Sequence, residues 1–175
     1  YVIMKVSGVT GRVLGRIDLN TGVCTSVNPV PSVGNLGTNF SSITFDETGQ
    51  MWGATGNGAV PSEALFKIDK NTSDTTFIYT MGSGADGEIL CYNRIDDHMY
   101  HWSGNGTVIM EKWPVNNVTY TPINIPISGI NGGETFGMLY NGETTFICSN
   151  ISSNLKRVST TGSYDAATLI NNPDD

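Results

Sequence analysis

A recurrence of about 47 residues is the feature of this 175-residue sequence that most constrains its fold. Three segments each begin with an apolar run, pass a turn rich in Asn, Asp and Gly, and continue into a run that contains an aromatic residue. Aligning Phe45, Tyr92 and Tyr140 gives spacings of 47 and 48 residues. A period in this range is typical of the four-stranded blades of β-propellers.

Each pair of runs is followed by a second hairpin with the same order of features. Residues 65–69 read Leu-Phe-Lys-Ile-Asp, and after a polar turn residues 75–79 read Thr-Thr-Phe-Ile-Tyr. The runs that begin at Val108 and Leu155 follow the same scheme. We therefore expect an all-β chain of four-stranded antiparallel blades, with almost no helix. The predicted complete blades are residues 41–80, 87–125 and 134–170.

The first part of the chain fits this scheme as an incomplete blade. Residues 16–22 (Arg-Ile-Asp-Leu-Asn-Thr-Gly) match residues 67–73 (Lys-Ile-Asp-Lys-Asn-Thr-Ser), so residues 1–30 are predicted to supply three strands and to lack the innermost one. The chain would then contain fifteen strands. An open propeller leaves an apolar blade face in water. We therefore expect half of a larger propeller, cut or processed from a longer chain. A small four-blade ring that is closed by a strand from elsewhere is the alternative.

A β-sandwich is the alternative architecture. Alternating hydrophobicity and regularly spaced turns fit a sandwich as well as they fit a propeller. A sandwich does not, however, predict a 47-residue recurrence. The propeller is therefore favoured over the sandwich.

Two phrases of the sequence resemble known repeats. Residues 43–53 (Ile-Thr-Phe-Asp-Glu-Thr-Gly-Gln-Met-Trp-Gly) and 65–72 (Leu-Phe-Lys-Ile-Asp-Lys-Asn-Thr) are similar to divergent bacterial β-propeller repeats of the NHL and quinoprotein-like types. The resemblance covers nearly the whole chain and implies a propeller of a secreted or surface protein. Such propellers include adhesins, scaffolds, lyases and sugar-processing enzymes, so the resemblance says little about activity.

Charge and composition exclude some functions. The chain has 9 Lys and Arg against 16 Asp and Glu, a net charge of −7, and its basic residues are scattered. Binding to nucleic acid through a basic patch is therefore not expected. No apolar run approaches the roughly 18 residues that a membrane helix needs, so we expect no membrane insertion. Low Lys and abundant Thr, Ser and Asn favour an extracellular or cell-surface location, with the periplasm as an alternative.

Cysteine and histidine give no sign of a metal or cofactor site. Cys24, Cys91 and Cys148 are widely spaced, and we interpret them as small buried hydrophobes, with one disulfide and one free thiol as the alternative. His98 and His101 are the only histidines. Residues three apart on a strand point to opposite faces, so these two are not expected to share a metal.

The candidate ligand site follows from the propeller model. Loops that enter the innermost strand, and loops between the second and third strands, would lie on one face around a central channel. Carboxylates and amides there, with aromatic rings on the second strands beneath, could bind a sugar or a cation. Packing between blades is nevertheless the favoured role of the two tryptophans. The predicted site residues are Asn57, Asp86, Glu88, Asn105, Asn131, Glu134, Trp52 and Trp102.

Three functions remain open from the sequence. The leading hypothesis is a non-catalytic extracellular binding or scaffold module that contacts protein or glycan through the propeller face. The second is a lyase or glycoside hydrolase in which Glu88 and Glu134, on comparable loops, form the carboxylate pair that such chemistry needs. The third is a purely structural repeat whose partner is the remaining blades of its own full-length chain.

Overall fold

The computed structural model describes residues 1–28, 36–37, 39–81, 89–103, 109–116, 120–125, 135–140, 145–150, 155–162 and 164–165. These residues form fifteen β-strands and no helix, so the prediction of an all-β chain is confirmed for this part of the sequence. Accordingly, the described residues contain no helix that could span a membrane. The chain divides into two compact units, Tyr1–Met81 and Gly82–Asp175.

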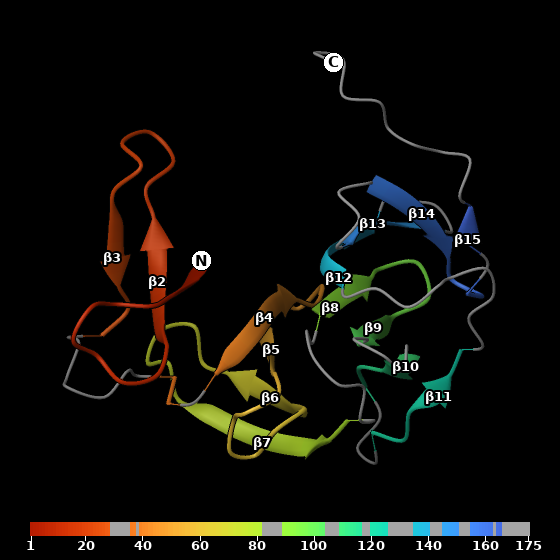
Figure 1. The fold of residues 1–175 in the computed structure, drawn as a ribbon, viewed down its shortest axis with the longest axis horizontal. Coiled ribbons are helices and arrows are strands. Elements are labelled where there is room, and N and C mark those ends of the chain that lie inside the picture. Colours follow the sequence, from red (N-terminus) through yellow and green to blue (C-terminus); the bar gives the residue numbers. More distant parts are fainter. Residues whose placement is uncertain are drawn as a thin grey trace. The chain divides into compact units, whose positions relative to one another are not determined.

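The first unit contains two antiparallel sheets, each built from strands that are consecutive in the sequence (Figure 1). One sheet has three strands, in the order β1-β2-β3, and the other has four, in the order β4-β5-β6-β7. The strands are β1 (Val2–Met4), β2 (Val13–Ile17), β3 (Cys24–Ser26), β4 (Phe40–Phe45), β5 (Met51–Thr55), β6 (Ala64–Ile68) and β7 (Thr75–Thr80).

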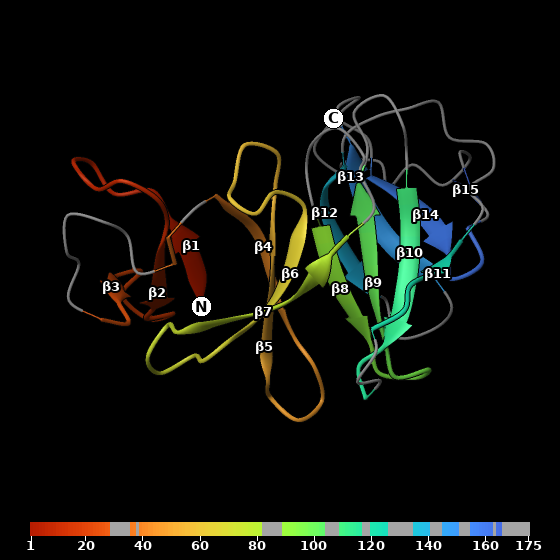
Figure 2. The same cartoon turned by 90° about the horizontal axis from the view of Figure 1, so that it is seen from below.

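The second unit repeats this plan with two four-stranded sheets (Figure 2). Their orders are β8-β9-β10-β11 and β12-β13-β14-β15, again without any crossover. The strands are β8 (Ile89–Asn93), β9 (His98–Ser103), β10 (Ile109–Pro114), β11 (Ile123–Asn124), β12 (Thr135–Tyr140), β13 (Thr145–Asn150), β14 (Leu155–Ser159) and β15 (Tyr164–Asp165). The described strands thus fall into groups of three, four, four and four, which is the grouping that the repeat predicts.

The core of the first unit lies between its two sheets. Side chains alternate between the two faces of a strand, so each sheet presents every second residue to the other. Leu14 from β2 is fully buried against residues of the second sheet, with Ile3 and Val27 packed beside it. The core residues are Leu14, Leu36, Phe40, Met51, Ala64, Phe66 and Ile68, bordered by Ile3, Val27, Ile43 and Phe45.

The two turns that the sequence comparison paired are built alike. Asp18 Oδ1 accepts hydrogen bonds from the backbone N–H groups two and three residues later, at 2.8 and 3.3 Å. Asp69 Oδ1 does the same at 2.7 and 3.2 Å. The fifth residue of each turn, Gly22 or Ser73, has a positive φ, of 70° and 61° respectively. Such Asx turns explain why Asp and Asn recur at these places.

One prediction about the cysteines is wrong. Cys91 is buried, as expected, but Cys24 is exposed on the edge strand β3. Neither forms a disulfide within the described part of the chain. Side chains on an edge strand are buried only where another layer covers them, so composition alone could not predict that Cys24 is exposed. The side chain of Cys148 lies outside the described residues.

Candidate functional site

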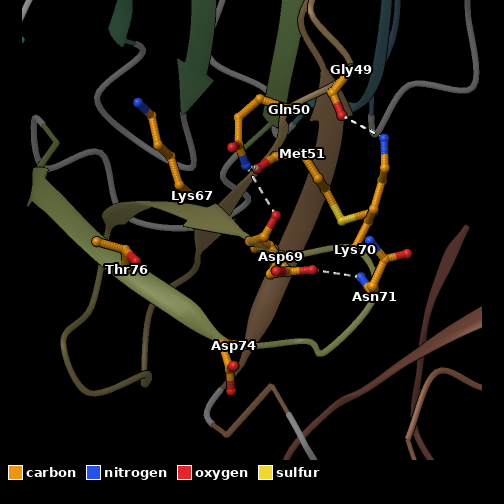
Figure 3. Close-up of a pocket in the computed structure, with 10 residues that line it drawn as sticks. Gly49, Gln50, Met51, Lys67, Asp69, Lys70, Asn71, Asp74 and Thr76 are labelled. Carbon is orange, nitrogen blue, oxygen red and sulfur yellow. Dashed lines mark hydrogen bonds between the residues drawn. The ribbon is translucent and has the colours of Figure 1, made fainter.

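An open hollow of about 460 Å³ lies at one end of the β4–β7 sheet (Figure 3). Two hairpin turns form it: the turn from β4 to β5 and the turn from β6 to β7. Because the strands are antiparallel and consecutive, both turns lie at the same end of the sheet. The lining residues are Gly49, Gln50, Met51, Lys67, Ile68, Asp69, Lys70, Asn71, Asp74 and Thr76.

Hydrogen bonds tie the two turns together. Lys70 Nζ donates to the backbone oxygen of Gly49 at 3.0 Å, and Gln50 Nε2 donates to the backbone oxygen of Ile68 at 3.0 Å (Figure 3). From β2 of the neighbouring sheet, the Arg16 guanidinium donates to Asn71 Oδ1 at 3.2 Å. The two turns that line the hollow are therefore held in place by side chains that bridge different strands.

The chemistry of the lining is polar and balanced in charge. Two ammonium groups (Lys67, Lys70) and two carboxylates (Asp69, Asp74) surround it. Amide groups and the hydroxyl of Thr76 add further donors and acceptors. Such a lining offers hydrogen bonds in both directions without a strong net charge, which suits a neutral polar ligand better than an ion.

A carboxylate at the β4–β5 turn organises the strand behind the hollow. Asp46 Oδ1 accepts hydrogen bonds from the Thr48 hydroxyl at 2.6 Å and from the backbone N–H of Gln50 at 3.1 Å. Its Oδ2 accepts one from Trp52 Nε1 at 2.8 Å. Partial burial by itself would raise the pKa of Asp46, but these hydrogen bonds outweigh it and hold the pKa below its usual value.

A cation above an aromatic ring recurs in three sheets. Lys67 Nζ lies 4.8 Å from the centroid of the Trp52 ring, and these residues are direct partners across β5 and β6. Lys112 lies 5.3 Å from the Tyr100 ring, and the two are partners across β9 and β10. In the first sheet, Arg16 lies 5.2 Å from the ring of Tyr1. Cation–π attraction and coverage of the ring by the side-chain stem both stabilise this arrangement.

The carboxylate is repeated as well. Tyr100 donates its hydroxyl hydrogen to Asp96 Oδ2 at 2.7 Å, and Trp52 likewise donates its indole N–H to Asp46 Oδ2 at 2.8 Å. Lys112 Nζ also reaches Asp96 Oδ2, at 3.1 Å. Burial and the neighbouring Asp96 carboxylate both raise the pKa of Tyr100, so the phenol stays protonated. A neutral phenol in this position is a structural hydrogen-bond donor and is not a nucleophile.

A buried ionisable pair in the second unit was missed by the sequence reasoning. His101 and Glu111 are partners across β9 and β10, and His101 Nδ1 lies 3.1 Å from Glu111 Oε1. Both side chains are buried, at 0% and 2% exposure. That these two residues face each other depends on the exact register of β9 and β10, which the sequence does not give. Among the described residues, no group of three or more His, Cys, Asp and Glu side chains could hold a metal ion.

Three of the predicted site residues fall in the described part of the chain. Trp52 and Trp102 are buried, at 1% and 2% exposure, so neither indole presents its ring to solvent. Asn57 is exposed in the connection from β5 to β6, at the end of the sheet opposite the hollow. The other predicted residues, Asp86, Glu88, Asn105, Asn131 and Glu134, lie outside the described residues.

The hollow could have been found in the sequence only in part. Its carboxylates and amides stand in the turn at residues 69–74, which was interpreted as a hairpin turn alone. The signal that distinguishes this turn from its counterpart at residues 18–22 is Lys70, where the first turn has Leu19. Lysine can bridge to a neighbouring turn, whereas leucine cannot.

Comparison with known proteins gives matches to solved structures only. No protein-family model and no curated protein matches the chain. A protein of unknown function from Desulfotomaculum acetoxidans superposes with a TM-score of 0.60 and 18% identity over 95% of this chain and 54% of that one. A candidate 6-phosphogluconolactonase from Bacteroides uniformis superposes with a TM-score of 0.53 and 13% identity, over 93% of this chain and 51% of that one. At these identities the similarity concerns the fold alone, and the chain spans about half the length of each protein.

Proposed function

We propose that the chain is part of a β-propeller of divergent bacterial type, in which each sheet is one blade, and that it acts as a non-catalytic binding module outside the cytoplasm. The propeller is supported by four sheets of consecutive antiparallel strands and by the repeated pairing of a cation with an aromatic ring. A sandwich of two sheets would not require the same side-chain pair to recur in successive sheets.

The observation that carries the binding function is the hollow at the end of the β4–β7 sheet. Its polar lining converges from two turns that are fixed by hydrogen bonds. Preformed polar sites lose little conformational entropy when they bind. A carbohydrate, whose hydroxyls both donate and accept, matches this balanced lining best, and an exposed polar loop of a protein is the alternative ligand.

No aromatic ring is among the residues that line the hollow, so we expect weak binding. Stacking of a sugar on an aromatic face supplies much of the affinity in tight carbohydrate sites. A dissociation constant of about 1 mM would correspond to a binding free energy of roughly −4 kcal/mol. A surface protein that displays many copies would compensate for this by multivalency.

The test is a glycan array followed by titration of each positive sugar by NMR. Thr76→Val removes one hydroxyl from the lining, and we expect it to weaken binding about threefold to tenfold. Thr25→Val is the matched control, because Thr25 holds the corresponding place in the first sheet. Thr25 of β3 pairs with Arg16 of β2, just as Thr76 of β7 pairs with Lys67 of β6. Equal effects of the two variants, or no binding to any sugar or surface protein, would contradict the proposed site.

The enzyme hypothesis is not favoured by any described residue. Glu88 and Glu134 lie outside the described part of the chain, and the Bacteroides uniformis match is too distant to transfer an activity. Lactone hydrolysis or glycan cleavage by the chain, abolished by Glu88→Gln or Glu134→Gln, would replace the binding proposal.

A further inference from the structure

Strand β7 forms a long edge of the β4–β7 sheet. It pairs with β6 on one side, and no other described strand pairs with its other side. The last strands of the other three sheets are short, with three residues in β3 and two each in β11 and β15, whereas β7 has six. Proteins protect sheet edges from pairing by shortening them or by placing Lys or Pro on them. The sequence of β7, Thr-Thr-Phe-Ile-Tyr-Thr, has none of these protections.

The register of β7 identifies the backbone groups on its open side. The backbone N–H of Asp69 donates to the backbone oxygen of Asp74 at 2.8 Å, so these two residues form a hydrogen-bonded pair at the start of the ladder. Hydrogen-bonded and non-hydrogen-bonded pairs alternate along antiparallel strands. Thr76 therefore directs its N–H and C=O towards β6, whereas Thr75 and Phe77 direct theirs to the open side.

A bulge in β7 leaves this stretch regular. The register shifts after Phe77, where Ile78 is the extra residue. Residues 75–77 therefore pair with β6 without interruption. All three residues are exposed, Phe77 at 51%. Their open side thus offers two N–H groups and two C=O groups at the spacing that a neighbouring strand requires.

The side chains beside this edge differ between the two faces of the sheet. On the core face, the ring centroid of Phe77 lies 5.7 Å from that of Phe66, which lies 5.1 Å from that of Phe40. An apolar side chain placed beside Phe77 would continue this row of rings. Thr76 and Asp74 line the hollow, on the other face (Figure 3). A strand along this edge would therefore meet an apolar surface on one face and a polar surface on the other.

We propose that β7 binds an extended segment of another protein, which adds to the four-stranded sheet as a further antiparallel strand. The backbone of a strand satisfies all of the N–H and C=O groups on the open side at once. The segment places apolar residues beside Phe77 and Thr75 and a polar residue beside Thr76. A basic residue follows beside Asp74, because the carboxylate and the net charge of −7 both attract a cation.

Hydrogen exchange of the 175-residue chain, followed by NMR, tests the edge directly. The probe is the capped peptide Thr-Val-Thr-Val-Lys, in which the valines pair with Phe77 and Thr75. We expect the amides of these two residues to exchange rapidly in the free chain and at least about tenfold more slowly with the peptide. The amide of Thr76 should be protected in both states. Protection of Thr75 and Phe77 without peptide would overturn the proposal, since a second copy or another segment would then cover the edge.

Methylated peptides test whether the backbone is recognised. In the proposed register the two valines direct their N–H groups at β7, and the central threonine directs its N–H away. We expect a dissociation constant of about 1 mM or lower for the parent peptide and for its N-methylthreonine form. N-methylation of the valines should weaken binding at least about tenfold. No binding of the parent peptide at about 5 mM, or equal losses from both methylations, would overturn the proposal.

A substitution on the edge tests the place of binding. Phe77→Lys should weaken peptide binding at least about tenfold, because it replaces an apolar contact with a charge. Ile123→Lys is the matched control, because Ile123 is 50% exposed on β11, the last strand of another sheet. Equal effects of the two variants would contradict binding at β7. Phe77→Lys should leave sugar binding in the hollow unchanged, since Phe77 lies on the other face, so the two proposals can fail independently.

Discussion

Replacing Asp46 with Asn tests whether the carboxylate at the β4–β5 turn holds the strand behind the hollow. Every group around this side chain is a donor: the backbone N–H and hydroxyl of Thr48, the backbone N–H of Gln50, and Trp52 Nε1. An amide has one acceptor oxygen and one donor group. If the amide oxygen accepts from Thr48 and Gln50, the amide NH₂ group points at the indole N–H of Trp52. Two donors then face each other where Asp46 Oδ2 now accepts a hydrogen bond of 2.8 Å.

The expected cost follows from the burial of Trp52. The residue is 1% exposed, so water cannot replace the lost acceptor. Leaving a buried donor without a partner costs roughly 1–3 kcal/mol. Because Asp46 itself is only partly buried, solvent screens its own charge and the lower part of this range applies. We expect Asp46→Asn to lower the free energy of unfolding by about 1–2 kcal/mol at neutral pH.

Urea unfolding followed by circular dichroism measures this loss, and a double-mutant cycle with Trp52→Phe assigns it. Phenylalanine has no N–H, so Asp46→Asn should cost about 1 kcal/mol less in that background. Equal costs in both backgrounds would refute the assigned role of Asp46. The effect should also depend on pH. Since the folded pKa of Asp46 is lowered, its contribution is present above the unfolded value of about 3.9 and is lost as the pH falls through the folded pKa.

Three further substitutions test other parts of the structure. Gly22→Ala should lower the free energy of unfolding by about 1 kcal/mol in urea titrations, because φ is +70° and the new Cβ meets nothing within 4 Å. Gly53→Ala should cost about 1–3 kcal/mol in the same assay, because its Cβ would lie 2.6 Å from Ile68 Cδ1 and 2.9 Å from the Phe40 ring. Tyr100→Phe should make the free energy of unfolding fall less steeply in alkali. The folded pKa of Tyr100 is raised, so its contribution to the free energy of unfolding is complete below about pH 10 and is lost as the pH rises. Phenylalanine does not titrate, so the variant lacks this loss.

The strand pattern was predictable because it depends on local chemistry. Alternating apolar residues and turns that contain Asp, Asn and Gly identify strands and hairpins wherever they occur. The Asx turn of Asp69 has the same hydrogen bonds as that of Asp18, so similar sequence corresponds to similar structure. Exposure of Cys24 was not predictable, because it depends on whether another layer covers β3.

The cation–aromatic pairs were not found from the sequence, although a signal for two of them existed. Tyr1 and Arg16 are 15 residues apart, as are Trp52 and Lys67, but Tyr100 and Lys112 are only 12 apart. The connection from β9 to β10 is shorter than the connections from β1 to β2 and from β5 to β6. The spacing of 15 residues between the aromatic residue and the cation is therefore not repeated in the third pair. Only the register of the strands shows that Trp52 and Lys67 are partners, and that Tyr100 and Lys112 are partners. A search for identical residues also fails, because the aromatic and the cation each vary within their class.

The packing pair is repeated while the turns differ, and the three-stranded first sheet has no counterpart of β4, so the turn that contains Leu19 has no neighbouring β4–β5 turn. Leu19 and Lys70 occupy the same place in matching turns. Leu19 is 93% exposed, whereas Lys70 Nζ reaches across to the backbone oxygen of Gly49 at 3.0 Å. This bridge holds the β6–β7 turn beside the β4–β5 turn, and the space between them becomes a walled hollow. Lys70 therefore helps to make this hairpin turn part of the proposed binding site.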